Sequence, residues 1–103
     1  MAEYSWPDDG ERLAKTAADR WAETVEALPE GSIVTGRVIG RQSFGVFVNI
    51  GGTPGAIGLA EITSMPRDAA LPPVGTTVGG TVIGHAVHNH QVRLRLYDFM
   101  RPD

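Results

Sequence analysis

Hydrophobic residues in the first third of the chain recur at helical spacing. The apolar positions from residue 13 onward lie three or four residues apart, at Leu13, Ala17, Trp21, Val25 and Leu28. This period places them on one stripe of an α-helix. Pro29 cannot continue a helix, so the pattern predicts one amphipathic helix that ends at residue 28. The small residues Ala14, Ala18 and Ala22 widen its apolar side, which suits packing on the rest of the chain, on a protein partner or on a second copy of itself.

Beyond Pro29 the period changes from 3.6 to 2, which is typical of β-strands. In the first predicted strand Val34, Gly36 and Val38 share one face, and Thr35, Arg37, Ile39 and Arg41 share the other. In the second, residues 44–50, one face carries Val46, Val48 and Ile50, and Phe47 has the opposite parity. Further strands are predicted at about residues 55–59, 77–87 and 92–96, with a single helical turn within residues 60–73.

Five short strands, with glycines where they bend and a connection between the third and fourth, are typical of the five-stranded Greek-key barrel called the OB-fold. The prediction is therefore a mainly β fold, an OB-fold barrel preceded by one N-terminal amphipathic α-helix. We divide the chain into an acidic helical extension at residues 1–28, the barrel at 29–97 and a short tail at 98–103.

Composition narrows the function classes. The 103 residues include no cysteine, which excludes a disulfide framework, a thiolate metal site and a cysteine nucleophile. The net charge of −3 is unevenly distributed, because residues 1–29 hold seven acids and three bases, whereas residues 30–98 hold five arginines and four acids. The acidity therefore belongs to the extension and the barrel is slightly basic.

The beginning of the chain is polar and acidic. It has no basic flank followed by an apolar run, and no window of eighteen apolar residues occurs anywhere. We therefore expect a cytoplasmic protein that does not bind membranes.

Four blocks of residues, in order, resemble the RNA-binding domain repeated in ribosomal protein S-one and appended to polynucleotide phosphorylase and several ribonucleases. They are Glu30-Gly31 leading to Gly36-Arg37-Val38, then Phe44-Gly45-Val46-Phe47-Val48, then Gly55-Ala56-Ile57-Gly58-Leu59-Ala60-Glu61-Ile62, and Val74-Gly75 with Val78 and Val82. The resemblance covers about residues 29–97 and implies an OB-fold that binds RNA. It leaves residues 1–28 without a counterpart.

In that family the RNA-contacting face is built from two phenylalanines, a histidine, an aspartate and an arginine. Phe44 and Phe47 match the phenylalanines. The histidine position is occupied by Gly58, the aspartate position falls near Ala86 or Val87, and the arginine position falls near Gln91. The resemblance therefore carries over the stacking residues and loses the polar ones.

The residues themselves support a stacking surface. The parity of Phe47 places it on the sheet surface, where exposed aromatic rings of OB-folds stack on bases, and Phe44 lies near it. Four arginines, Arg37, Arg41, Arg93 and Arg95, point outward from the first and fifth strands. We expect those strands to be neighbours in this barrel topology, so that the arginines form one strip suited to phosphates.

Three histidines, His85, His88 and His90, lie at the last hairpin. No cysteine exists and no carboxylate is near in sequence, so we expect no metal site, and we assign His88 and His90 to RNA contacts or solvent. Spacings typical of a Ser-His-Asp triad, paired catalytic carboxylates or a phosphate-binding glycine loop are absent, so we expect no enzymatic activity and no cofactor.

Two functions remain open. The first is a small, non-catalytic protein that binds single-stranded RNA through base stacking and arginine–phosphate contacts. The alternative is a protein-interaction module that has lost most RNA contacts. In a variant of the first, the acidic extension folds across the basic face and competes with RNA. Both tryptophans, Trp6 and Trp21, lie outside the predicted barrel.

Overall fold

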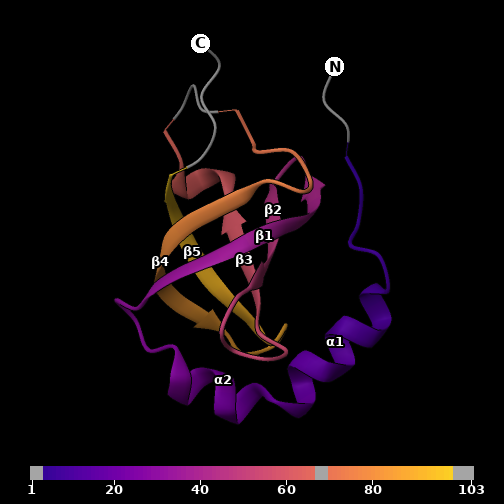
Figure 1. Ribbon diagram of the computed structural model, residues 1–103, viewed down its shortest axis with the longest axis vertical. Coiled ribbons are helices and arrows are strands. Elements are labelled where there is room, and N and C mark those ends of the chain that lie inside the picture. Colours follow the sequence, from indigo (N-terminus) through magenta and orange to yellow (C-terminus); the bar gives the residue numbers. More distant parts are fainter. Residues whose placement is uncertain (1–3, 67–69, 99–103) are drawn as a thin grey trace.

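The computed structural model describes residues 4–66 and 70–98 and confirms a barrel preceded by helical structure (Figure 1). The helical segment is divided into α1, Gly10–Asp19, and α2, Trp21–Ala27. The break falls at Arg20, whose φ of −107° and ψ of 13° lie outside the helical region. This change of direction lets α1 descend along one side of the barrel while α2 runs beneath it. Neither helix in the described ranges is long and apolar enough to cross a bilayer.

Five strands form a closed barrel. They are β1 (Ile33–Gln42), β2 (Gly45–Ile50), β3 (Ile57–Glu61), β4 (Thr77–Ala86) and β5 (Gln91–Asp98), and a short 3₁₀ turn, η1 (Ile62–Ser64), follows β3. Their order around the barrel is β1-β2-β3-β5-β4, with β4 returning to pair with β1. β3 and β5 pair in parallel and the other neighbours are antiparallel. The predicted OB-fold architecture is therefore confirmed.

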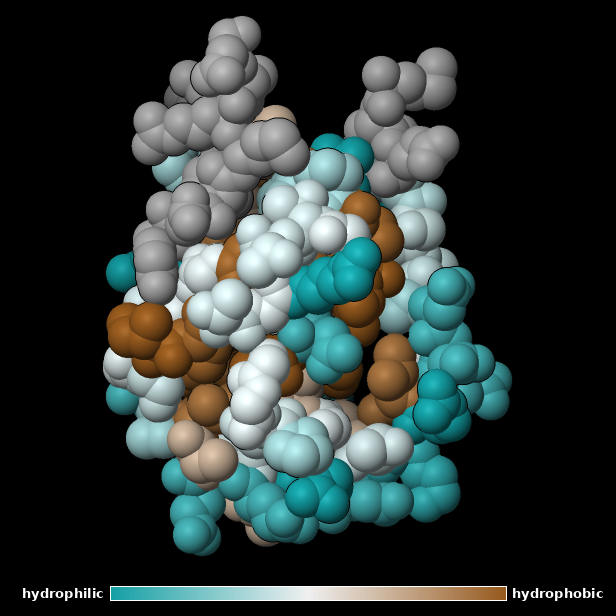
Figure 2. Space-filling view, viewed as in Figure 1, coloured by the Kyte–Doolittle hydropathy of each residue, from teal (hydrophilic) through white to brown (hydrophobic). Residues whose placement is uncertain are grey.

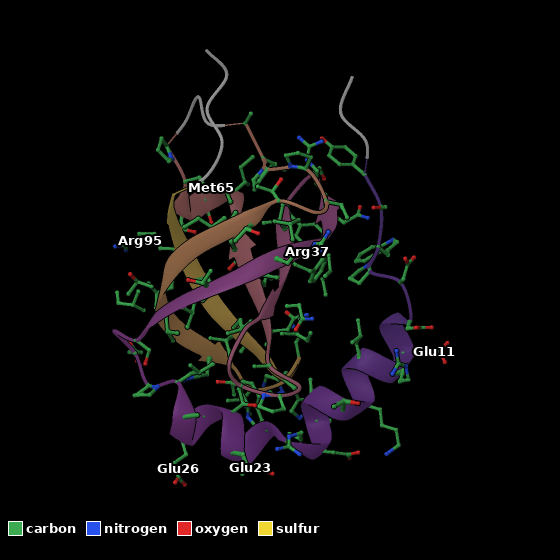
Figure 3. All side chains as sticks on the ribbon, viewed as in Figure 1. Glu11, Glu23, Glu26, Arg37, Met65 and Arg95 are labelled. Atoms are coloured by element: carbon green, nitrogen blue, oxygen red, sulfur yellow. The ribbon has the colours of Figure 1, made fainter. Side chains whose placement is uncertain are left out.

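The barrel interior is filled by the apolar residues at alternating strand positions, as the period of two in the sequence predicts. Its most buried large side chains include Val38, Val46, Val48, Val82, Val92 and Leu94. Both ends of the barrel are closed by other parts of the chain. Leu28 joins the core, with Trp21 packed against it, and Met65, which follows η1, joins it at the opposite end (Figure 3). The helical segment therefore takes part in the core as well as lying outside it.

Three register shifts interrupt the alternation, one of them between Gly79 and Gly80, where β4 pairs with the end of β5. The other two lie between Val38 and Gly40 in β1 and between Val82 and Gly84 in β4. A bulge adds one unpaired residue, so every side chain beyond it changes face. These shifts decide which of the predicted site residues share a surface.

Leu94→Ala tests the core. Leu94 is 1% exposed. Deleting a buried leucine side chain leaves a cavity, so we expect the free energy of unfolding to fall by about 2–5 kcal/mol, measured by urea denaturation. The control Ile33→Ala removes an apolar side chain that is 68% exposed and should change stability by less than about 0.5 kcal/mol. Equal effects of the two substitutions would contradict this description of the core.

Candidate functional site

The outer faces of β2 and β3 carry the predicted stacking residue. Phe47 lies opposite Leu59 across the β2–β3 pair, and Asn49 lies opposite Ile57. Directly opposed residues project from the same face of a sheet. Phe47 is not part of the barrel core, so its outward parity is as predicted. Its side chain is nevertheless only 7% exposed.

Phe47 is covered because the chain before α1 lies across this face. Ser5 and Arg41 form an isolated β-bridge with reciprocal backbone hydrogen bonds, each of 2.8 Å. Gly40 admits the segment, since a Cβ there would come within 2.7 Å of Pro7 Cδ. The prediction that Phe47 is exposed is therefore wrong. Strand parity reports which way a side chain points and carries no information about a distant segment that packs on it.

Three aromatic rings form a cluster here. The Trp6 ring centroid lies 5.8 Å from that of Phe47 and 6.2 Å from that of Phe44, and the two phenylalanine rings meet edge to face at 5.9 Å. Trp6 remains 65% exposed and Phe44 42% exposed. The accessible aromatic surface is thus made by Trp6 and Phe44, supported by Phe47. Sequence reasoning missed Trp6, because it lies outside the region of the family resemblance.

A cavity of about 300 Å³ opens beside this cluster, between α1 and the barrel. Its apolar lining residues are Trp6, Pro7, Leu13, Ala14, Ala17, Ile39, Phe47 and Ile57. Asn89, His90 and Gln91 line it from the β4–β5 turn. A second cavity of about 230 Å³ shares Leu13 and Ile39 and is also lined by Asp8, Arg37 and Asn49. In Figure 2 the surface is hollowed between the barrel and the helical arm, with brown apolar residues on both sides.

The predicted strip of four arginines does not form. β1 and β5 are not neighbours, because β4 lies between them on one side of the closed barrel and β2 and β3 lie between them on the other. In Figure 3, Arg95 points outward on the far side of the barrel from α1, whereas Arg37 lies over β1 at the front. The strand order of the barrel decides whether these arginines share a surface. That order does not follow from the outward parity of each arginine.

Arg41 also leaves the predicted face. Beyond the β1 bulge it lies opposite Val46, whose side chain points into the barrel. Its guanidinium reaches the end of the barrel, donates a hydrogen bond of 2.9 Å to the Leu71 carbonyl and lies 5.8 Å from the centre of the Tyr4 ring. Arg41 thus holds together the N-terminal segment and the loop before β4.

Arg37 and Arg93 flank the aromatic cluster from opposite sides. Arg37 lies opposite Asn49 on the outer face, is exposed, and has no hydrogen bond or ion pair with the described residues. Arg93 lies beside Leu59, which itself lies opposite Phe47, and its Nη2 forms an exposed ion pair of 3.2 Å with Glu61. With strands about 4.8 Å apart, Arg93 stands about 10 Å from Phe47 across the sheet.

The three histidines separate. His85 Nε2 donates a hydrogen bond of 2.7 Å to the Leu28 carbonyl, and both His85 and His90 meet the ring of Trp21 edge on. His90 adopts a left-handed conformation, with φ of 54°, and also lines the larger cavity. His88 is exposed. Across residues 4–66 and 70–98 no group of three or more potential metal ligands comes together.

Gly58, at the family's histidine position, faces the barrel interior. A Cβ there would come within 2.5 Å of Leu94 Cδ1 and 3.2 Å of Ile50 Cδ1. The residue beside Phe47 on the outer face is Leu59, which cannot form side-chain hydrogen bonds. The missing histidine is thus not replaced by another polar group at this place on β3.

Gly58→His and Leu59→His test this assignment. A histidine at position 58 overpacks the core, so we expect a loss of at least about 1–3 kcal/mol in unfolding free energy, measured by urea denaturation. A histidine at position 59, which is half-buried on the outer face, should cost less. If Gly58→His is the milder substitution, the inward orientation of position 58 is wrong.

Comparisons with known proteins agree with this fold. No family model matches the chain. The chain is 28% identical over 85 residues to the small ribosomal subunit protein bS1 of Staphylococcus saprophyticus, a match that covers 79% of this chain and 21% of that protein. The chain thus corresponds to about a fifth of that relative.

Solved structures with the same fold include GSP13 from Bacillus subtilis, with a TM-score of 0.56, 24% identity and coverage of 67% of this chain and 55% of that one. A second is the complex of a/eIF2alpha, aDim2p and rRNA from Pyrococcus horikoshii, with a TM-score of 0.55, 24% identity and coverage of 65% and 43%. A third is Mycoplasma genitalium RNase R in complex with ribose-methylated single-stranded RNA, with a TM-score of 0.64, 17% identity and coverage of 86% and 16%. The solved structures show the OB-fold, and the sequence match to protein bS1 supports a domain of the S-one type.

Proposed function

We propose that this S-one type OB domain is a non-catalytic, cytoplasmic module that binds single-stranded RNA. The observation that carries the proposal is the exposed aromatic surface of Trp6 and Phe44 on the outer side of the barrel, supported by Phe47. OB-folds bind nucleic acids on the face that includes strands two and three, and bases stack on exposed rings there. The relative that is a ribosomal protein, and the two RNA-containing structures of the same fold, are consistent with this role.

Stacking supplies most of the binding energy in this proposal. Each stacked base contributes about 1–3 kcal/mol without regard to its identity. Arg37 and Arg93 supply phosphate contacts on the two sides of the aromatic cluster, and Arg93 exchanges its Glu61 partner for a phosphate. The barrel segment, residues 30–98, has five arginines against four acids, so bulk electrostatic attraction is weak. We therefore propose modest affinity with little sequence preference.

Phe44→Ala tests the stacking contribution. We expect it to weaken binding of a labelled single-stranded RNA about 5–150-fold, the loss of one stacked base, measured by fluorescence anisotropy. Ile33→Ala removes a more exposed apolar side chain at the beginning of β1 and should leave affinity unchanged. If the unmodified protein binds no RNA, the proposal fails and the protein-interaction alternative takes its place.

Arg37→Gln tests the phosphate contacts. Each phosphate contact contributes about −0.7 to the slope of log K against log salt for a single strand, so we expect the slope to become shallower by about that amount. Arg12→Gln is the matched control, because Arg12 pairs with Asp9 on the exposed side of α1. An unchanged slope for Arg37→Gln would remove Arg37 from the interface.

A further inference from the structure

We infer that the larger cavity between α1 and the barrel is a pocket for one unstacked nucleobase, and that the N-terminal segment is part of the RNA-binding site. This inference rests on the proposed function and assigns to the same surface a pocket that uses Trp6 and α1. Neither of these belongs to the region that resembles the S-one type domain. The segment then acts as a wall, which means that its side chains line the binding site. The alternative is a mask, which means a segment that occupies the site and competes with RNA.

The shape of the cavity suits a flat aromatic ligand. The rings of Trp6 and Phe47 form one part of its lining, the small and branched side chains of α1 form a second, and Ile39 and Ile57 from the barrel form a third. Its volume of about 300 Å³ lies at the lower limit of small-molecule sites, which span about 300–1,000 Å³. That volume accommodates one base and is too small for a helix of a protein partner.

The polar side of the cavity suits the edge of a base. Asn89 and Gln91 carry side-chain amides that both donate and accept hydrogen bonds, as the edges of the bases do. Neither amide has a side-chain hydrogen bond to another described residue. Gln91 is half-buried, so an apolar occupant would leave its amide without a protein partner, whereas a base edge can pair with it and with the exposed amide of Asn89.

The neighbouring cavity suits the sugar and phosphate attached to that base. It shares Leu13 and Ile39 with the first cavity, and Arg37 and Asn49 lie in its lining. Asp8 is the carboxylate in the same lining, so the phosphate must lie nearer to Arg37 than to Asp8. The helix acids Glu11, Glu23 and Glu26 point away from the barrel in Figure 3, so they do not repel a bound strand at close range.

The orientation of the helix acids also distinguishes a segment that lines the RNA site from a segment that blocks it. An acidic segment that competes with RNA would direct its carboxylates at the arginines it neutralises. Here Asp8 is the one acid of the segment that lines either cavity, beside Arg37, and the other side chains that the segment directs toward the barrel are apolar or aromatic and leave a cavity open between them. Its contacts therefore complete a binding surface.

The decisive substitution is Ala14→Phe, which fills the cavity from α1 and leaves every residue of the aromatic cluster and every arginine unsubstituted. We expect it to weaken binding of labelled single-stranded RNA about 5–150-fold, because one base loses its place. Ala18→Phe is the matched control, since Ala18 is an exposed alanine on the same helix that does not line the cavity. It should leave affinity within about twofold, and circular dichroism of both variants checks that they fold.

For a second variant, Trp6→Ala, the two alternatives predict opposite changes in RNA affinity. Trp6 is 65% exposed, so its removal should leave the fold intact. A wall residue that is lost weakens RNA binding, whereas a mask that is lost uncovers Phe47 and strengthens it. Stronger binding by Trp6→Ala would therefore overturn the inference.

Nuclear magnetic resonance can observe the pocket directly. On addition of the four nucleoside monophosphates one at a time, we expect the side-chain amide signals of Asn89 and Gln91 and the indole N–H of Trp6 to shift, and Ala14→Phe to abolish the shifts. If RNA binds while Ala14→Phe behaves like Ala18→Phe and these signals stay unchanged, the inference fails and the proposed function stands. If the unmodified protein binds no RNA, both fail.

Discussion

The pairing of β1 with β4 closes the barrel, and the other features of the molecule depend on this closure. Once the sheet is closed, the residues of alternating parity fill one interior, and the remaining apolar side chains on β1, β2 and β3 must lie outside it. Phe47, Ile39 and Ile57 are such side chains. Leaving them in water would cost free energy, since apolar surface is stabilised by burial. The N-terminal segment covers them, and this makes it an integral part of the domain.

The N-terminal segment covers this outer face of the barrel only in part. The uncovered part forms a cavity lined mainly by apolar and aromatic side chains. The β-bridge between Ser5 and Arg41 fixes one end of the segment on the barrel, and Leu28 fixes the other end in the core. Between them α1 is held by small side chains and leaves a cavity above the sheet. This surface exposes two rings and encloses a third, so in the proposed function binding depends more on aromatic contact than on charge.

Most of the fold could be predicted from the sequence, because strand faces and turns are determined by residues that are adjacent in the chain. Alternation of apolar residues selected the inward faces of β1, β2 and β5, and the glycine- and proline-rich stretches marked the turns. The division of the helix at Arg20 was not predicted, because the apolar stripe continues through it. The third strand begins two residues later than expected, because Gly55, with φ of 79°, belongs to the turn before it.

The sequence by itself determined most of the residues that point into the barrel and the outward direction of Phe47. Only the tertiary structure decided which of the outward residues meet. The bulge in β1 moved Arg41 to the inward face, the strand order separated the arginines of β1 and β5, and the N-terminal segment covered Phe47 and added Trp6. Side-chain direction follows from the period of a strand, a property of adjacent residues, whereas these outcomes depend on pairing and packing between segments far apart in the chain.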